Sequence, residues 1–279
     1  MFTDVIVRFF LGEDTFIVKK SIIGAVALVA IGVAPALAAD LPARTYTKAP
    51  PVLPVVSYNW TGCYIGGNVG GGWAKTEQTR IGLVNGTVLP AQDYGSASGS
   101  SFIGGGQIGC DYQFAGNWVV GLQGMFDFGK INSSHIFPPF PTFSSADSMK
   151  NIYTATARIG YLFAPQVLGY VKGGGAWTTT DSIVTIPSAA NFLSESALGN
   201  TRSGWTVGGG LEWMFAPSWS VFAEYNYMDF GRKNIGYVPG PLTAPGSVGD
   251  LLSTRLTAQT ALLGVNYKFN FGSPVVAKY

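Results

Sequence analysis

The sequence predicts an all-β protein, an eight-stranded antiparallel up-and-down transmembrane β-barrel. The first observation is a strand near the C-terminus whose alternate residues are apolar, a pattern typical of an extended strand between two different environments. Its apolar face consists of Ala261, Leu263, Val265, Tyr267 and Phe269. The second observation is that this pattern recurs between short turns and longer polar stretches. The third is composition: 47% of the 279 residues are hydrophobic and 11% are charged, whereas soluble domains carry about 25% charged residues.

The apolar residues are dispersed rather than gathered into long runs. One segment, residues 22–39, is apolar enough for a membrane helix, whereas helical membrane proteins carry several runs of about 20 such residues. The chain also contains 38 glycines, and its formal net charge is +2. The composition therefore favours a strand-built membrane protein, and it lacks the basic excess of a protein that binds nucleic acid.

The N-terminal segment predicts export. Lys19-Lys20, an apolar run and the small-residue site Ala36-Leu37-Ala38 follow one another as in a secretory signal peptide. We expect residues 1–38 to be removed, with cleavage after Ala38 or one residue later. Residues 1–17 carry acidic side chains that are unusual in front of such a signal. Two hypotheses stay open for them: translation starts at Val18, or the signal begins with a long n-region.

Proline marks the segment that follows the signal. Residues 39–57 are proline-rich, which predicts an unpaired periplasmic tail, either a spacer or a contact to the cell wall. We expect the barrel over residues 58–271 and a short tail over residues 272–279.

Turns and polar stretches divide the barrel into eight strands. The three short turns are Ala115-Gly116-Asn117, Ala164-Pro165-Gln166 and Ala216-Pro217-Ser218. Four longer stretches are expected to be external loops: 75–100, 130–148, 179–203 and 232–254. In chain order, with the apolar residues of the outward face, the strands are predicted at 60–74 (Ile65, Val69, Trp73), 101–114 (Phe102, Ile108, Tyr112), 117–129 (Val120, Leu122, Phe126), 149–163 (Tyr153, Ala157, Ile159, Tyr161), 167–179 (Val171, Trp177), 204–215 (Val207, Leu211, Trp213), 219–231 (Val221, Ala223, Tyr225, Tyr227) and 255–269.

The sheet is expected to close on itself. In hydrocarbon an unpaired strand edge leaves backbone groups without partners, at a cost of several kcal/mol each, so the first strand should pair with the eighth. In the fifth strand, Leu168 and Tyr170 compete with Val171 and Trp177 for the outward face. A soluble lipocalin-like barrel is the alternative fold, but it would place the apolar residues inside.

Four motifs then suggest a family. They are Asn59-Trp60-Thr61-Gly62-Cys63-Tyr64-Ile65-Gly66, Ala39-Asp40-Leu41-Pro42-Ala43, Phe102-Ile103-Gly104-Gly105-Gly106-Gln107-Ile108-Gly109 and Gly264-Val265-Asn266-Tyr267-Lys268-Phe269. With these motifs the chain resembles the Omp25/Omp31-like porin family of alphaproteobacteria over nearly its whole mature length. The resemblance implies an eight-stranded barrel in the outer membrane, often called a porin or surface antigen. Cys63 departs from the aromatic residue expected at that position.

The inward faces of the strands collect ionisable residues. They are Asp127, Arg158, Lys172, Glu212, Glu224 and Lys268. The interior of an eight-stranded barrel is just wide enough for side chains to fill it, so these charges should form pairs. We expect Arg158 to pair with Glu212 or Glu224. Two interpretations stay open: a structural polar core, or a narrow path that conducts water or ions.

The two cysteines share outward parity on neighbouring strands. Cys63 lies near the start of the first strand and Cys110 near the end of the second, so the two positions should lie side by side. Because the periplasm is oxidising, we predict a Cys63–Cys110 disulfide. The alternative is two free thiols.

Nothing in the sequence predicts catalysis. His135 is the single histidine, and it stands beside Ser133 and Ser134 without an evident acidic partner. The G-x-G-x-x-G match over residues 104–109 opens no helix, so it predicts no dinucleotide site. We therefore expect no enzyme, no cofactor and no metal.

The expected role is that of a structural envelope component that allows narrow passive diffusion of small solutes. The alternative is a surface-exposed adhesin or binding protein that uses its loops, because residues 130–148 and 232–254 carry apolar and aromatic side chains. Expected partners are outer-membrane lipid, lipopolysaccharide and the barrel assembly machinery. That machinery would read the aromatic end of the last strand, Phe269 with Tyr267.

Overall fold

The computed structural model describes residues 58–187, 192–240 and 246–269. The predicted signal peptide, the proline-rich tail and the C-terminal tail lie outside the described residues. Eight long strands and one short strand make up the structure: β1 (Gly62–Leu83), β2 (Val88–Phe114), β3 (Trp118–Phe137), β4 (Phe140–Ala164), β5 (Val167–Pro187), β6 (Phe192–Ala216), β7 (Trp219–Gly236), β8 (Val238–Pro239) and β9 (Asp250–Phe269). In this part of the chain, no helix has the length and hydropathy needed to cross a membrane.

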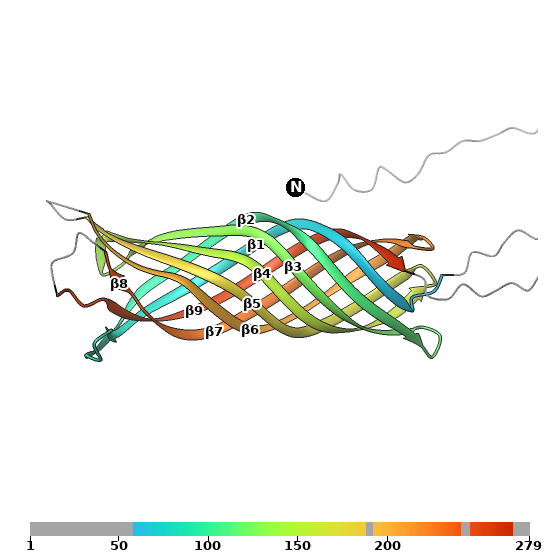
Figure 1. Cartoon of the computed structure of the whole chain (residues 1–279), viewed down its shortest axis with the longest axis horizontal. Coiled ribbons are helices and arrows are strands. Elements are labelled where there is room, and N and C mark those ends of the chain that lie inside the picture. The colour runs from blue at the N-terminus through green and yellow to red at the C-terminus, as the bar shows by residue number, and fades with distance from the viewer. Residues whose placement is uncertain (1–57, 188–191, 241–245, 270–279) are drawn as a thin grey trace, which may run out of the picture. The chain divides into compact units, whose positions relative to one another are not determined.

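The eight long strands close into a ring (Figure 1). Their order around the ring is β1-β2-β3-β4-β5-β6-β7-β9, every neighbouring pair is antiparallel, and β9 pairs back onto β1. The short strand β8 pairs with β6. The predicted all-β antiparallel barrel and its closure by the first and last strands are therefore confirmed. The three predicted turns separate β2 from β3, β4 from β5 and β6 from β7.

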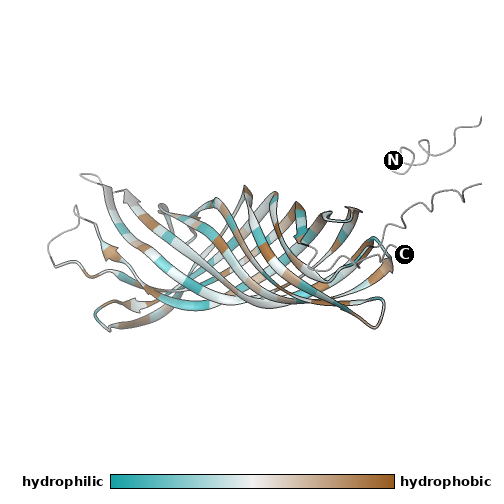
Figure 2. Cartoon of the chain, turned by 45° about the vertical axis from the view of Figure 1, so that its right-hand side comes forward, coloured by the Kyte–Doolittle hydropathy of each residue, from teal (hydrophilic) through white to brown (hydrophobic). Residues whose placement is uncertain are grey.

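Apolar side chains cover the outside of the barrel. Hydropathy alternates along the strands (Figure 2), and the outward positions are exposed, as in Leu122 at 69% and Val171 at 59%. Leu168 and Tyr170, which compete with Val171 in the sequence, are buried inside the barrel. The inversion relative to a soluble barrel, with apolar residues facing out, fits a hydrocarbon surrounding.

Two bands of aromatic residues encircle this outer surface. The turn-side girdle consists of Tyr112, Phe114, Trp118, Tyr161, Phe163, Trp213, Phe215, Trp219, Tyr267 and Phe269. The hairpin-side girdle consists of Trp73, Phe102, Phe126, Phe128, Tyr153, Trp177, Trp205 and Tyr225. On β3, Trp118 belongs to one girdle and Phe128 to the other, so the strand between these two residues spans the distance between the girdles. That length matches the roughly 9–11 tilted residues with which a barrel strand crosses hydrocarbon.

The four stretches predicted as long loops are largely strand, which corrects that expectation. β1 continues to Leu83 and β2 resumes at Val88, while β3 and β4 are separated by residues 138–139 alone. We call the part of the barrel beyond the hairpin-side girdle the hairpin-side extension. It has a core of its own, made of Tyr94, Phe137, Val184, Ala197, Ile235, Tyr237 and Leu252. Beyond the girdle the β2–β3 pairing ends at Gly104 and Phe128 and the β6–β7 pairing ends at Trp205 and Asp229, whereas the other neighbouring strands stay paired. This core and the remaining cross-strand pairing explain why the strands do not end at the girdle.

Candidate functional site

A buried network of four charges occupies the interior of the barrel near the turn-side end. Arg158 on β4 bonds Asp111 on β2, with its Nε 2.8 Å from Oδ1 and its Nη2 2.5 Å from Oδ2. Arg158 Nη1 also donates to Glu212 Oε2 on β6 at 3.0 Å. Lys268 on β9 completes the network, with its Nζ 2.9 Å from Asp111 Oδ2. Two cations and two carboxylates therefore balance one another.

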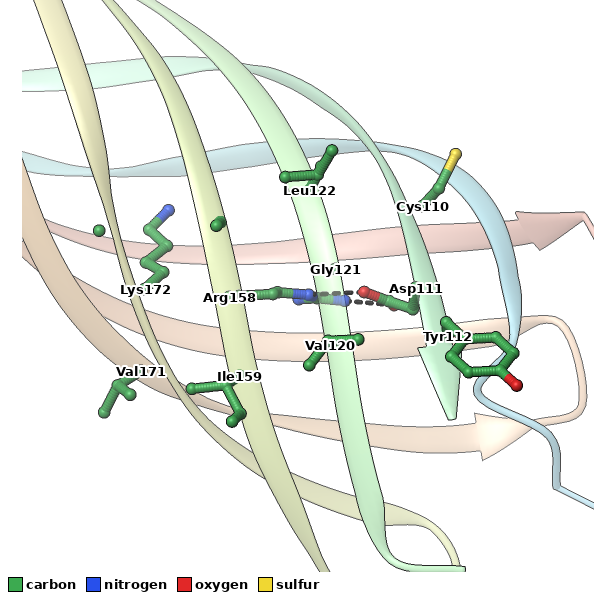
Figure 3. A pocket seen from close by; sticks show the side chains of 12 residues that line it. Cys110, Asp111, Tyr112, Val120, Gly121, Leu122, Arg158, Ile159, Val171 and Lys172 are labelled. Atoms are coloured by element: carbon green, nitrogen blue, oxygen red, sulfur yellow. Dashed lines mark hydrogen bonds and ion pairs between the residues drawn. The ribbon is translucent and has the colours of Figure 1, made fainter. Parts of the chain in front are cut away.

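A glycine allows Arg158 to reach Asp111. The two residues lie on strands that flank β3, and Gly121 of β3 is the register partner of both. Figure 3 shows Arg158 and Asp111 pointing toward each other across Gly121. A Cβ atom at Gly121 would lie 2.2 Å from Asp111 Oδ1, so a larger residue there would push the carboxylate away.

Aromatic rings enclose the two cations of the network. The Arg158 guanidinium lies between the rings of Tyr64 and Tyr170, 4.9 Å and 5.0 Å from their centroids. Lys268 Nζ lies 4.3 Å from the centroid of Trp60. Trp60 is fully buried, and its Nε1 donates to the Pro165 carbonyl at 3.0 Å. These contacts add cation–π attraction to the ion pairs.

A second ion pair lies beside the first network. Lys172 Nζ is 2.5 Å from Glu224 Oε1 and donates to Gln123 Oε1 at 2.9 Å. The Tyr170 hydroxyl donates to Glu224 Oε2 at 2.8 Å. Of the two partners expected for Arg158, the structure therefore places Glu212 against it and Glu224 against Lys172.

The structure brings five of the six predicted interior charges into these two groups and leaves Asp127 apart. Asp127 is buried, makes no ion pair within the described residues, and its Oδ1 has no hydrogen-bond partner there. Asp111, which no sequence argument singled out, is the centre of the larger network. The sequence predicts that Asp111 faces inward, because its neighbours Cys110 and Tyr112 face outward. It does not predict the contact with Arg158, which lies two strands away.

Apolar layers lie on both sides of the charges. On the turn side, Trp60, Val119, Leu162, Leu168, Tyr170 and Met214 form one cluster. On the hairpin side, a second cluster consists of Ala74, Ile131, Met149, Ile152, Ala176, Met228, Phe230, Leu256 and Ala258. A cavity beside Ile131, Met149 and Arg202 has about 10 Å³ of space for the centre of a water molecule, which is enough for about one water.

A buried carboxylate lies in the hairpin-side extension. Asp147 accepts hydrogen bonds from Gln78 Nε2 at 3.1 Å and from Ser182 Oγ at 2.5 Å, and it forms no ion pair with a cation of the described residues. Burial raises the pKa of Asp147 above its usual range. His135 lies outside any triad: its Nε2 contacts the Tyr94 carbonyl at 3.0 Å rather than a serine or a carboxylate.

The remaining predicted residues lie at the turn-side end. Cys63 and Cys110 are register partners on β1 and β2, and the structure joins them by a disulfide at a sequence separation of 47. Phe269 ends β9 as the register partner of Cys63, and its ring lies 5.2 Å from that of Tyr267. No group of residues able to hold a metal ion occurs in the described ranges.

The chain is similar to known proteins over most of its length. Residues 24–269 match the family described as the outer membrane protein beta-barrel domain. The 31 kDa outer-membrane immunogenic protein of Brucella melitensis is 28% identical over 84% of this chain and 93% of its own length. The 25 kDa outer-membrane immunogenic protein of Brucella abortus is 24% identical over 85% of this chain and 92% of its own length. Among solved structures, the outer membrane protease OmpT of Escherichia coli is 9% identical over 77% of this chain and 99% of that chain, with a TM-score of 0.47.

Proposed function

Because the chain belongs to the outer membrane protein β-barrel family, we propose that it is a structural component of the outer membrane whose interior is closed to solutes. Its short turns then face the periplasm and its hairpin-side extension faces the outside. The location in the outer membrane is supported by the Brucella relatives, which are named as outer-membrane proteins.

The observation that carries the proposal is the filled interior. Arg158, Glu212 and Lys268 are each at most 3% exposed, and apolar clusters lie on both sides of them. A conducting path needs a continuous column of water or of weakly held charges. Paired ions that are enclosed by aromatic rings favour a rigid plug instead, which argues against the narrow passive diffusion expected from the sequence.

Planar bilayer recording of the refolded protein tests this proposal. We expect no reproducible conductance steps from barrels whose insertion is verified by protease protection. Steps that shift when Arg158→Met or Glu224→Gln is introduced would refute the closed interior. The matched control is Leu122→Ala on the outward face, which should leave any conductance unchanged because that side chain faces lipid.

Surface binding is the second candidate function. It is supported by exposed apolar side chains in the hairpin-side extension, namely Val88 at 86%, Ile136 at 61%, Leu198 at 62% and Val238 at 66%. The names of the Brucella relatives also describe immunogenic proteins. We expect cells that display the protein to lose adhesion to a host-cell layer when Val88 and Ile136 are replaced by serine. Equal adhesion of both strains, at equal surface amounts of protein, would exclude these side chains as the binding surface.

A further inference from the structure

A short segment in front of β1 crosses the turn-side mouth of the barrel. We call residues 58–61 the strap, and none of these residues belongs to a strand. Trp60 Nε1 donates a hydrogen bond to the carbonyl of Pro165, which lies in the turn between β4 and β5. In the order of strands around the ring, that turn lies opposite β1. The Trp60 side chain therefore links one side of the mouth to the other.

A glycine at the start of β1 lets the chain bend into the strap. Gly62 has a φ of 147°, a backbone conformation that glycine adopts without steric cost. A Cβ atom at this position would lie 2.8 Å from the carbonyl oxygen of Phe269. Just before the bend, Asn59 Oδ1 accepts a hydrogen bond from the Thr61 N–H at 2.9 Å. The chain thus leaves the wall of the barrel and places Trp60 inside the mouth, where it is fully buried.

Side chains, rather than strand pairing, hold the strap in place. The Trp60 N–H donates to Gln113 Oε1 at 3.1 Å, and the Gln113 N–H donates to Thr61 Oγ1 at 3.0 Å. Trp60 belongs to the turn-side apolar cluster, and Tyr58 packs against the same cluster. Because none of these contacts is part of the cross-strand ladder, the strap can be loosened without breaking the ring of strands.

The strap covers a charge that lies at the very end of the barrel. Lys268 is followed by Phe269, the last residue of β9, yet it is only 1% exposed. Its Nζ lies 4.3 Å from the centroid of the Trp60 ring and 2.9 Å from Asp111 Oδ2. A lysine at the end of a strand ordinarily extends its ammonium group into water. Here the indole of Trp60 lies against that ammonium group instead.

We propose that the strap seals the turn-side mouth, and that the Trp60 indole keeps the charge network around Arg158 out of contact with the solution on that side. The proposal rests on the closed interior proposed above and names the part that closes one end of it. At the other end, the hairpin-side apolar cluster remains in place whether or not the strap is present. Removing the indole would leave a space directly beside Lys268, and water would enter as far as the charge network.

Reductive methylation of the refolded protein with formaldehyde and cyanoborohydride, read by mass spectrometry of its peptides, tests the seal. In the wild type we expect methylation of the exposed lysines, which include Lys75, Lys130 and Lys233. The buried Lys172 and Lys268 should stay unmodified. In Trp60→Ala we expect Lys268 to be methylated at a rate approaching that of the exposed lysines, while Lys172 stays protected by its pair with Glu224. Trp60→Phe keeps a ring over the ammonium group and should restore the protection.

Trp118→Ala is the matched control, because Trp118 lies at the same end of the barrel but is 42% exposed on the outer face. It should leave Lys268 unmodified. Equal methylation of Lys268 in Trp118→Ala and Trp60→Ala would overturn the proposal in favour of a general loosening of the barrel end. Methylation of Lys268 in the wild type would also overturn it, as would an unmodified Lys268 in Trp60→Ala whose β-structure is verified by circular dichroism.

A second variant decides the question if Trp60→Ala does not fold. Gln113→Ala removes the acceptor of the Trp60 N–H and leaves the indole in the chain. Faster methylation of Lys268 than in the wild type would support the seal, and an unchanged rate would overturn it. The two proposals also fail separately. Conductance steps from the wild type would refute the closed interior, whereas a Lys268 that stays unmodified in folded Trp60→Ala would refute the strap alone.

Discussion

Replacing Arg158 with methionine should strongly destabilise the barrel. The substitution keeps most of the side-chain volume, so the cavity contribution is small. It removes a guanidinium that makes bonds of 2.8, 2.5 and 3.0 Å to Asp111 and Glu212. Two buried carboxylates would then share one cation, Lys268. Removing one partner of a buried ion pair costs about 3–5 kcal/mol, which corresponds to roughly a hundredfold to a few thousandfold in the unfolding equilibrium.

A double variant tests whether the loss of stability in Arg158→Met comes from unbalanced charge or from lost packing. In Arg158→Met/Glu212→Gln, the remaining Lys268 and Asp111 still lie 2.9 Å apart and balance each other. We therefore expect the double variant to be more stable than Arg158→Met alone. The assay is urea unfolding of the refolded protein in phosphatidylcholine vesicles, followed by the fluorescence of its 7 tryptophans. A single variant within about 1 kcal/mol of wild type, or a double variant weaker than the single, would refute the reasoning.

Three further predictions concern other parts of the barrel. Thiol labelling of the unfolded, unreduced protein should find Cys63 and Cys110 blocked, and replacing both with serine should lower stability by about 2–4 kcal/mol; full labelling would mean free thiols. Because burial raises the pKa of Asp147, the contribution of this residue to the stability of the hairpin-side extension should be fully present below its unfolded pKa of about 3.9 and be lost as pH rises through its folded pKa. Hydrogen exchange should show this trend in the wild type and not in Asp147→Asn; an identical trend in both would assign it elsewhere. Leu122→Arg on the lipid face should cost about 2–4 kcal/mol in the same urea assay, whereas Val88→Arg in the hairpin-side extension should cost little, and equal costs would contradict the position of the membrane band.

The alternation of apolar and polar residues predicted the membrane-spanning part of the fold, because one face of each strand contacts lipid there and the other faces the polar interior. Leu122 and Gln123 differ in hydropathy as well as in exposure, so the period of two is visible in the sequence. In the hairpin-side extension the same period exists in burial without a matching period in hydropathy. Ser145 and Asp147 are buried there, while Ala146 between them is exposed. Because the buried residues are polar, the sequence of such a strand resembles that of a loop.

The interior network was harder to predict than the strands. Parity places Arg158 and Glu212 inside, but it gives no information about contacts across the lumen. Asp111 meets Arg158 over Gly121, and this contact depends on a missing side chain on the strand between them. Pairing between residues of non-adjacent strands follows from barrel diameter and strand stagger, which a single sequence does not contain.

The hairpin-side extension also sets how far the protein stands above the membrane. From Tyr153 at the girdle, β4 runs back to Phe140, a path of roughly 30 Å along the membrane normal for a strand with ordinary rise and tilt. In the orientation proposed above, a short surface glycan would leave the hairpin tips accessible, whereas long polysaccharide chains would cover them. Antibodies and phages should therefore reach the hairpin tips on cells with truncated glycans and be sterically shielded from them on cells with full-length chains.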